Sequence, residues 1–228
     1  MESTAVSDIF PLFSAAETET LDWLLSVAIE EEFAAEEKIL SDQYWGNAVY
    51  FIISGWVKTR RWHNETPITS SIQGRGDFFG ERAVLDEPPR ATEIVTLSET
   101  KVISISAQRF IQTLFQDPQL HHKLLQITVR RLKQADVHFQ LRHYPSVVKL
   151  AYTLVHLAEN YGRPTEDGME ILLFPEQDIA DIADLDLEET EKYMSKFQHK
   201  GWLEINEDEQ TLSITNLRQL SHLAGGNF

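Results

Sequence analysis

GDFFGERAVLDEPPRAT, residues 76–92, is the most informative stretch of the sequence. Its glycine-glutamate pair, Gly80 and Glu81, is followed nine residues after the glutamate by Arg90, across a turn with two prolines. A guanidinium can donate two parallel hydrogen bonds to a phosphate, and a carboxylate can accept one from a ribose hydroxyl. We therefore expect Glu81 and Arg90 to converge on the sugar and phosphate of a small ligand. Free backbone N–H groups can complete the anion site, at Gly80, Ala91 and Thr92.

The sequence around this stretch is typical of short β-strands. Between residues 38 and 106, short runs rich in β-branched and aromatic residues alternate with clusters of Gly, Pro, Asn and Asp. This spacing predicts a β-roll or sandwich and not βαβ units. The first 35 residues or so are predicted to be helical, because apolar residues recur at steps of three and four: Leu21, Leu24, Leu25, Ala28 and Ile29.

Length and composition are those of a globular protein with two domains. The chain has 228 residues, of which 42% are hydrophobic and 25% charged, and this balance argues against a disordered chain. The absence of cysteine excludes disulfides, thiolate catalysis and cysteine-held zinc or iron-sulfur clusters. No apolar run approaches the ~18 residues of a membrane span, and the N-terminus lacks a signal-peptide pattern. We expect a cytoplasmic protein with no membrane association.

A long helix is predicted after Asp117-Pro118, over residues 119–143. Its apolar residues recur at alternating steps of four and three, with Asp136 at one position of the seam: Leu125, Val129, Leu132 and Phe139. This pattern predicts a homodimer formed through residues 119–144. The alternative is a single helix that lies on its own domain. Pro145 interrupts the helix, so a further domain is expected to begin there.

The segment from residue 176 to residue 203 predicts a helix-turn-helix. Two short amphipathic helices flank a turn at Leu185-Asp186, where the aspartate can cap the second helix. The segments GWLEI and TLSI that follow predict a β-hairpin wing.

Together these segments resemble one known family. YFIISGWVK, residues 50–58, and the stretch at residues 76–92 resemble the cyclic-nucleotide-binding domain of the CRP/FNR regulators and of cyclic-AMP-dependent kinase regulatory subunits. Residues 176–203 resemble the winged helix-turn-helix of the CRP/FNR family. The resemblance covers nearly the full chain. It implies an α+β fold with a cyclic-nucleotide-binding β-roll over residues 1–118, a dimerisation helix over 119–144 and a winged helix-turn-helix over 145–228.

The resemblance also implies roles for the residues of the first stretch. Gly80 and Glu81 would hold the ribose, and the cyclic phosphate would meet Arg90, Ala91 and Thr92. Arg82 departs from the family pattern, which usually has an aliphatic residue there. The alternative is that Glu81 and Arg90 form a structural ion pair in a β-roll that binds nothing.

The identity of the ligand is open between cyclic AMP and a guanine-containing messenger such as cyclic di-GMP. In cyclic-AMP-responsive regulators a Thr-Ser pair on the long helix meets the adenine, and the corresponding residues here are Ala135 and Asp136. A carboxylate accepts hydrogen bonds and so suits the N–H edge of guanine. Nearby arginines could stack on bases or pair with phosphates, at Arg130, Arg131 and Arg142. The alternative for Asp136 is a solvated side chain with no ligand.

The charge of the C-terminal domain conflicts with its motif. By the resemblance, the edge that faces the DNA groove consists of Leu187, Glu188, Glu191, Lys192 and Lys196. Residues 144–228 carry 6 basic and 16 acidic side chains, whereas DNA-binding domains gain much of their affinity from basic residues. We expect a DNA-binding transcriptional regulator. The alternative is an effector with a weak or degenerate DNA-binding domain that acts through a protein partner.

Enzymatic motifs are missing from the sequence. It contains no HExxH, no P-loop and no GxSxG, and its eight histidines have no metal-ligand spacing. We therefore expect no catalytic residues, no metal and no cofactor, only an effector ligand.

Overall fold

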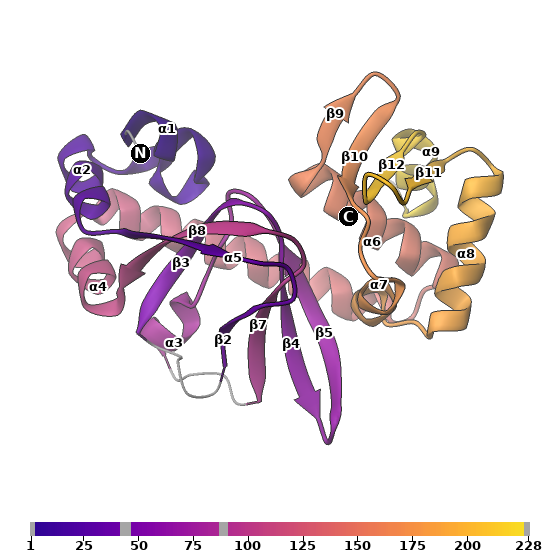
Figure 1. The fold of residues 1–228 in the computed structure, drawn as a ribbon, viewed down its shortest axis with the longest axis horizontal. Helices are drawn as coiled ribbons and strands as arrows, with labels where there is room; N and C mark the ends of the chain where they lie inside the picture. The colour runs from indigo at the N-terminus through magenta and orange to yellow at the C-terminus, as the bar shows by residue number, and fades with distance from the viewer. Residues whose placement is uncertain (1–2, 42–46, 87–90, 226–228) are drawn as a thin grey trace. The chain divides into compact units, whose positions relative to one another are not determined.

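The computed structural model describes residues 3–41, 47–86 and 91–225. The chain divides into two compact units, residues 1–133 and 134–228 (Figure 1). The boundary between them falls inside one long helix, α5, Pro118–Leu141. The finer three-part division expected from the sequence stays a prediction.

The first unit has helices at both ends and strands between them. Its helices are α1 (Ser3–Ile9), the 3-10 helix η1 (Pro11–Ala15), α2 (Thr18–Ser26), α3 (Glu81–Leu85), α4 (Ala107–Gln116) and most of α5. Its strands are β1 (Ile29–Phe33), β2 (Lys38–Leu40), β3 (Ala48–Ser54), β4 (Val57–His63), β5 (Thr66–Gln73), β6 (Phe78–Phe79), β7 (Thr92–Thr96) and β8 (Thr100–Ser106).

The strands of this unit form the predicted β-roll. In the described part of the chain they make two four-stranded antiparallel sheets, in the orders β1-β8-β3-β6 and β2-β7-β4-β5. Successive side chains of a strand point to opposite faces of its sheet. One face of each sheet therefore packs inside the roll, in a cluster made of Leu40, Ile52, Val57, Phe79, Ile94 and Val102.

The other face of the first sheet packs on the helices through aromatic rings. Phe51 of β3 is fully buried and its ring contacts those of Phe10, Phe13, Phe78 and Phe110, with centroids 4.8 to 6.3 Å apart. Aromatic pairs at such distances add to the free energy of burial. The short strand β6 lies within the stretch at residues 76–92 and directly precedes Gly80. Its Phe78 is thereby fixed to the core.

The prediction of a helix over the first 35 residues is wrong at its end. Helix α2 stops at Ser26, and β1 follows, paired antiparallel with β8. Ile29, assigned to the helical pattern, is 64% exposed and lies opposite Ser104. Pairing with a distant strand outweighed the local spacing, which is a common way for sequence patterns to mislead.

Helix α5 begins at a residue that caps it. The carboxylate of Asp117 accepts hydrogen bonds from the backbone N–H groups of Gln119 and Leu120, both at 2.9 Å, and from that of Glu17 at 3.0 Å. A carboxylate at this position offsets the unpaired N–H groups of the first turn. Leu120 and Leu124 then bury the start of the helix in the aromatic cluster between the first sheet and the helices.

The second unit contains the predicted two-helix motif and hairpin wing. Its elements are α6 (Ser146–Tyr161), β9 (Arg163–Thr165), β10 (Gly168–Leu172), α7 (Glu176–Ala183), α8 (Leu187–His199), β11 (Leu203–Asn206), β12 (Thr211–Ile214) and α9 (Leu217–Leu223), together with the end of α5. The wing strands extend a sheet of order β11-β12-β10-β9. As expected, Asp186 caps α8 by accepting from the N–H of Glu189 at 2.7 Å.

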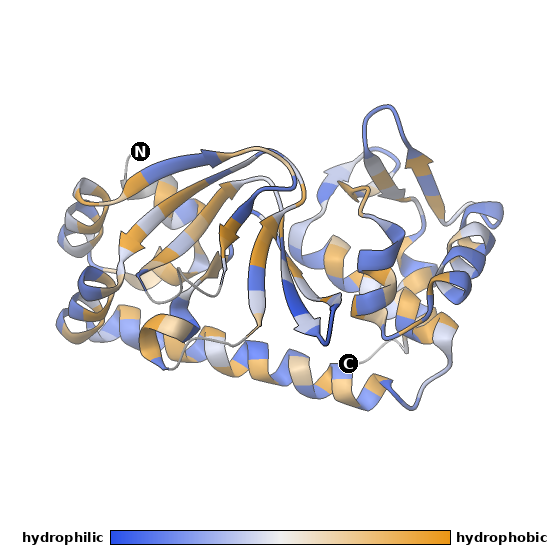
Figure 2. Ribbon diagram, turned by 60° about the horizontal axis from the view of Figure 1, so that its bottom comes forward, coloured by the Kyte–Doolittle hydropathy of each residue, from blue (hydrophilic) through white to orange (hydrophobic). Residues whose placement is uncertain are grey.

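The long helix α5 mixes apolar and polar residues along its whole length. Along α5, hydrophobic and hydrophilic residues alternate and leave no continuous apolar stretch (Figure 2). Among the described residues, none of the helices combines the length and hydropathy that a membrane span requires.

Candidate functional site

The site is built on a glycine that no other residue can replace without strain. Gly80 has a φ of +91°, and a Cβ there would lie 2.7 Å from the backbone oxygen of Ala48. Glycine adopts this left-handed conformation at little cost, whereas other residues rarely do. The turn at Gly80 ends β6 and starts α3, so that Glu81 is the first residue of the helix.

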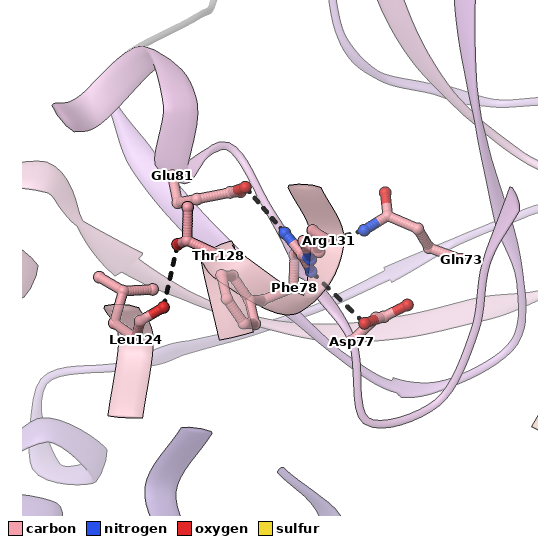
Figure 3. Close-up of polar contacts among 7 residues, drawn as sticks. All are labelled: Gln73, Asp77, Phe78, Glu81, Leu124, Thr128 and Arg131. Carbon is pink, nitrogen blue, oxygen red and sulfur yellow. Dashed lines mark hydrogen bonds and ion pairs between the residues drawn. The ribbon is translucent and has the colours of Figure 1, made fainter. Parts of the chain in front are cut away.

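The carboxylate of Glu81 is bound by an arginine of the long helix. Nη1 of Arg131 lies 2.8 Å from Oε1 of Glu81, and its Nη2 donates to the backbone oxygen of Phe78 at 2.9 Å (Figure 3). The same Nη2 is 3.4 Å from Oδ1 of Asp77, and the guanidinium lies 4.3 Å from the centre of the Phe78 ring. One side chain thus ties α5 to both β6 and α3.

Burial dominates the electrostatics of Glu81. Loss of solvent raises the pKa of this carboxyl above its ordinary value, since burial penalises the charged form, and nearby Asp77 acts in the same direction. Arg131, a backbone N–H and Arg82 oppose the shift, but the net direction is upward. Arg131 therefore compensates only part of the cost of burying Glu81.

The structure describes the stretch up to Asp86 and again from Ala91 onward. Arg90 lies outside the described residues, so its convergence with Glu81 stays a prediction. Ala91 has a φ of +50°, and its carbonyl accepts a hydrogen bond from the N–H of Trp62 at 2.9 Å. Thr92, the first residue of β7, is buried. The two ends of the stretch are therefore each anchored to the roll, by β6 and by β4.

The ligand residues expected on α5 do not share one environment. Arg131 is half-buried against β6 and α3, whereas Arg130 and Asp136 are exposed. Whether any of them contacts a ligand stays a prediction. No role was predicted from the sequence for Asp77, Phe78 or Gln73, although all three contribute to the contacts of Arg131. The side-chain amide of Gln73 donates to the same Phe78 oxygen at 3.1 Å. Of the three, Asp77 carries the clearest sequence signal, because it is a carboxylate three residues before Gly80 in the same stretch.

Helix α5 also carries an exposed apolar stripe, which we call the seam. It follows the predicted heptad positions and includes Asp136, which is exposed as well. Its apolar side chains are Leu125, Val129, Leu132 and Phe139, which are 56%, 44%, 62% and 64% exposed. Large apolar residues at regular spacing on an exposed helix face are typical of a surface that packs against another helix.

The residues expected to face DNA lie on the exposed surface of α8. All five are exposed, whereas Thr190, Met194 and Phe197 are buried and hold the helix in its unit. The exposed set consists of Leu187, Glu188, Glu191, Lys192 and Lys196. Their contact with DNA stays a prediction.

Two acidic residues of the second unit are engaged within it. Glu189 accepts from the hydroxyl of Ser146 at 2.9 Å, and Asp184 pairs with Lys149 at 3.2 Å. Among the residues that the structure describes, no cluster of three histidine or carboxylate side chains could hold a metal ion.

Comparison with known proteins matches both units to domain families. The cyclic nucleotide-binding domain matches residues 30–117, and the Crp-like helix-turn-helix domain matches residues 148–223. The chain is 24% identical over 199 residues to a CRP-like cAMP-activated global transcriptional regulator of Mycobacterium tuberculosis, over 85% of this chain and 88% of that protein.

Two solved structures have the same fold. FixK2 from Bradyrhizobium japonicum is 20% identical, with a TM-score of 0.73, over 86% of this chain and 97% of that one. The c-di-GMP responsive global regulator CLP of Xanthomonas campestris is 19% identical, with a TM-score of 0.66, over 87% of this chain and 99% of that one.

The raised pKa of Glu81 predicts how pH affects stability. A carboxyl whose pKa is raised in the folded state contributes most stability below its ordinary value of 4.5 and loses that contribution as the pH rises through its folded pKa. We therefore expect the free energy of unfolding of the wild type to fall relative to that of Glu81→Gln as the pH rises from 4 to 7. Urea unfolding followed by tryptophan fluorescence measures this, since four of the five tryptophans lie before residue 134.

The variant Arg131→Gln provides the control. Because Arg131 lowers the pKa of Glu81, the difference between Glu and Gln at position 81 should be larger when Arg131 is absent. A difference that moved in favour of the wild type with rising pH would mean that the ion pair outweighs burial.

Proposed function

The chain belongs to the CRP/FNR family of transcriptional regulators, with a cyclic nucleotide-binding domain followed by a Crp-like helix-turn-helix domain, and we propose that it acts as a ligand-controlled homodimer on DNA. The family consists of regulators and not of enzymes. In this proposal the β-roll binds a cyclic nucleotide or cyclic dinucleotide next to Glu81. Helix α5 carries the dimer contact, and α8 enters the major groove.

The contact of Arg131 with Glu81 carries this proposal. A sugar hydroxyl that donates to Glu81 would compete with Arg131 for the same carboxylate or add to its network. Since Arg131 belongs to α5, either event changes the forces on the helix that carries the seam. A ligand that alters the preferred position of α5 can thereby shift the population of DNA-binding states.

Two classes of ligand fit the proposed site. The relative from Mycobacterium tuberculosis is named as cAMP-activated, and CLP of Xanthomonas campestris is described as c-di-GMP responsive. In this chain Ala135 and Asp136 offer no hydroxyl to an adenine, whereas the exposed carboxylate of Asp136 can accept from the N1–H and N2–H groups of guanine. This difference favours a guanine-containing messenger over cyclic AMP.

The exposed seam supports a homodimer. Apolar side chains left in water at heptad spacing gain free energy when a second helix covers them, at about 25 cal/mol for each Å². A two-fold symmetric contact would bring the two seams together and Asp136 close to its own copy. Two facing carboxylates repel, so this position weakens the dimer unless solvent or a bound group compensates.

A second candidate function rests on the charge of the C-terminal unit. Glu188 and Glu191 are exposed on the same side of α8 as Lys192 and Lys196, and residues 144–228 carry a net charge of −10. Carboxylates next to a polyanion reduce affinity, most strongly at low salt. An effector that docks on another protein, with weak DNA binding of its own, is the alternative.

The first prediction concerns the nucleotide. We expect Glu81→Ala and Arg90→Ala each to weaken binding of cyclic di-GMP or cyclic AMP by about tenfold or more, because each removes a charge-assisted hydrogen bond. Isothermal titration calorimetry measures this. Arg75→Ala, in an exposed turn, is the control and should bind as the wild type does. Wild-type affinity in both test variants would contradict the proposed site.

The second prediction concerns the seam. Leu132→Glu places a charge on its apolar surface, so we expect this variant to be a monomer at concentrations at which the wild type is a dimer. Sedimentation equilibrium measures the difference. Phe115→Glu, at a side chain of α4 that is 83% exposed, is the control outside the seam. A dimeric Leu132→Glu protein would show that another surface holds the subunits together.

The third prediction separates the two candidate functions. If α8 contacts phosphates, DNA affinity falls as salt rises, and Lys192→Glu abolishes it. Lys101→Glu, on β8 of the roll, is the charge-matched control and should bind DNA as the wild type does. Fluorescence anisotropy with labelled promoter fragments over a salt series measures both effects. Absent or salt-independent binding by the wild type would favour the protein-partner alternative.

A further inference from the structure

Three rings meet where the end of α5 contacts α6, inside the second unit. The ring centroid of His138, in the last turn of α5, lies 5.7 Å from that of Tyr152 of α6, and the two planes are nearly perpendicular at 88°. It lies 6.4 Å from the ring centroid of His156, again at a steep angle. Tyr152 and His156 stack on each other at 5.8 Å. We call these three residues the ring cluster, which attaches the last turn of α5 to α6.

The chain between the two helices does not by itself fix the angle between them. Helix α5 ends at Leu141 and α6 begins at Ser146, and residues 142–145 between them are all exposed. Pro145, the last of them, has no N–H group for a hydrogen bond to the preceding turn. Exposed connections of this kind are more mobile than the helices that they join. The angle therefore depends on side chains that reach from one helix to the other, as the rings do.

Helix α6 is in turn joined to the predicted recognition helix α8. The hydroxyl of Ser146, in the first turn of α6, donates to the carboxylate of Glu189 of α8 at 2.9 Å. The ammonium of Lys149 pairs with Asp184, at the end of α7, and donates to its backbone oxygen at 3.0 Å. The start of α6 is thus tied to both helices of the motif. Whatever holds α6 against α5 also orients α8 relative to the last turn of α5, where the seam residue Phe139 lies.

We propose that His138 is a positioning residue for DNA binding: as a neutral ring it holds α6, and with it α8, against the end of α5, and as an imidazolium it releases them. This inference deepens the proposed function and rests on it. A neutral imidazole packs against aromatic rings much as an apolar side chain does, whereas a protonated one needs water or a carboxylate around it. Protons thus act on the orientation of α8 through the second unit and not through the β-roll.

The surroundings of His138 offer it no counter-ion within the described part of the chain. Burial lowers the pKa of its imidazole below the ordinary value, and no charged neighbour raises it. Glu159, the carboxylate of α6, acts on Tyr152 and not on His138. The titratable groups on the elements packed here are Lys149, Tyr152, His156 and Glu159 on α6, Lys133, Asp136 and Arg142 on or just after α5, and Arg218 and His222 on α9, which also packs on α6.

The direction of the pH effect follows from this burial. A base whose pKa is lowered in the attached state favours that state fully above its ordinary pKa, and the preference weakens as the pH falls below it. A released His138 takes up its proton with the ordinary pKa of 6.5. The ratio of attached to released α5 ends is therefore lower at about pH 6.0 than at about pH 7.5, by up to about fourfold.

Limited proteolysis of the full chain measures this release. Trypsin cleaves after Arg142, in the exposed connection, and the bond becomes accessible when the end of α5 leaves α6. The cleavage rate follows the released population when opening and closing are fast. His138→Phe keeps an aromatic ring that cannot be protonated, and the ratio of the two proteins cancels the pH dependence of trypsin itself. We expect the wild type, relative to this variant, to be cleaved up to about fourfold faster at pH 6.0 than at pH 7.5.

A matched control replaces a histidine outside the ring cluster. His63→Phe changes an exposed histidine at the end of β4 and should show the pH dependence of the wild type. An NMR titration of the wild type measures the pKa of His138 directly and does not depend on whether a variant folds. We expect this pKa to lie below 6.5.

The DNA affinity of the same proteins tests the positioning role. The two recognition helices of a dimer must keep the spacing of the two half-sites, so loss of their orientation weakens binding. We expect the affinity of the wild type for a promoter fragment, relative to His138→Phe, to fall between pH 7.5 and 6.0 by up to about fourfold for each subunit. Fluorescence anisotropy at constant salt measures this, because salt alone changes DNA affinity.

The outcomes separate this proposal from the function on which it rests. Equal pH dependence of cleavage in the wild type and His138→Phe, or a pKa of His138 at or above 6.5, would overturn the release. Release with no difference in DNA affinity would overturn the positioning role and leave the proposed function intact. A wild type that bound no DNA at either pH would overturn the proposed function and the positioning role with it, whereas cleavage would still decide whether protonation releases α5.

Discussion

The hydrogen bonds of Arg131 are the interaction on which the rest of the first unit depends. The guanidinium contacts the carboxylate of Glu81 and both the backbone carbonyl and the ring of Phe78, and it comes from a helix about fifty residues further along the chain. A buried carboxylate without such a partner would be costly, so Glu81 and Arg131 constrain each other. Any molecule that approaches Glu81 also approaches the link between the roll and α5.

The aromatic core holds Phe78 in place, and with it the contact that Arg131 makes. Phe78 packs on Phe51 within the core and lies under the guanidinium of Arg131, so that one ring serves both the core and the site. Phe51 in turn contacts rings from the N-terminal helices and from α4. Packing of this density resists small displacements, because a shift of one ring requires its neighbours to move. The position of Glu81 is therefore determined largely by residues that no ligand would touch.

The sequence predicted the parts of the structure that depend on local patterns. The heptad spacing in α5 predicted the exposed seam, and the apolar spacing around Asp186 predicted α7, α8 and the cap between them. Patterns could not reveal contacts between distant segments. The partner of Arg131 is fifty residues away, and the pairing of β4 with β7 follows from strand register, which depends on the whole sheet. The strand at Ile29 was missed for the same reason, since only its pairing with β8 makes it a strand.

The left-handed backbone of Ala91 bears on how rigid this end of the proposed site is. A residue with a Cβ holds this conformation only when its surroundings enforce it, at a cost of order 1–3 kcal/mol, and here the hydrogen bond from Trp62 contributes to that restraint. The conformational entropy of ordering this corner is thus lost when the chain folds and not when a ligand arrives. Glycine at the same position would relieve the strain but would return that entropic cost to the binding step. The alanine therefore makes the backbone at this end of the stretch rigid at the expense of folding stability, and a ligand held there would bind without paying that ordering cost.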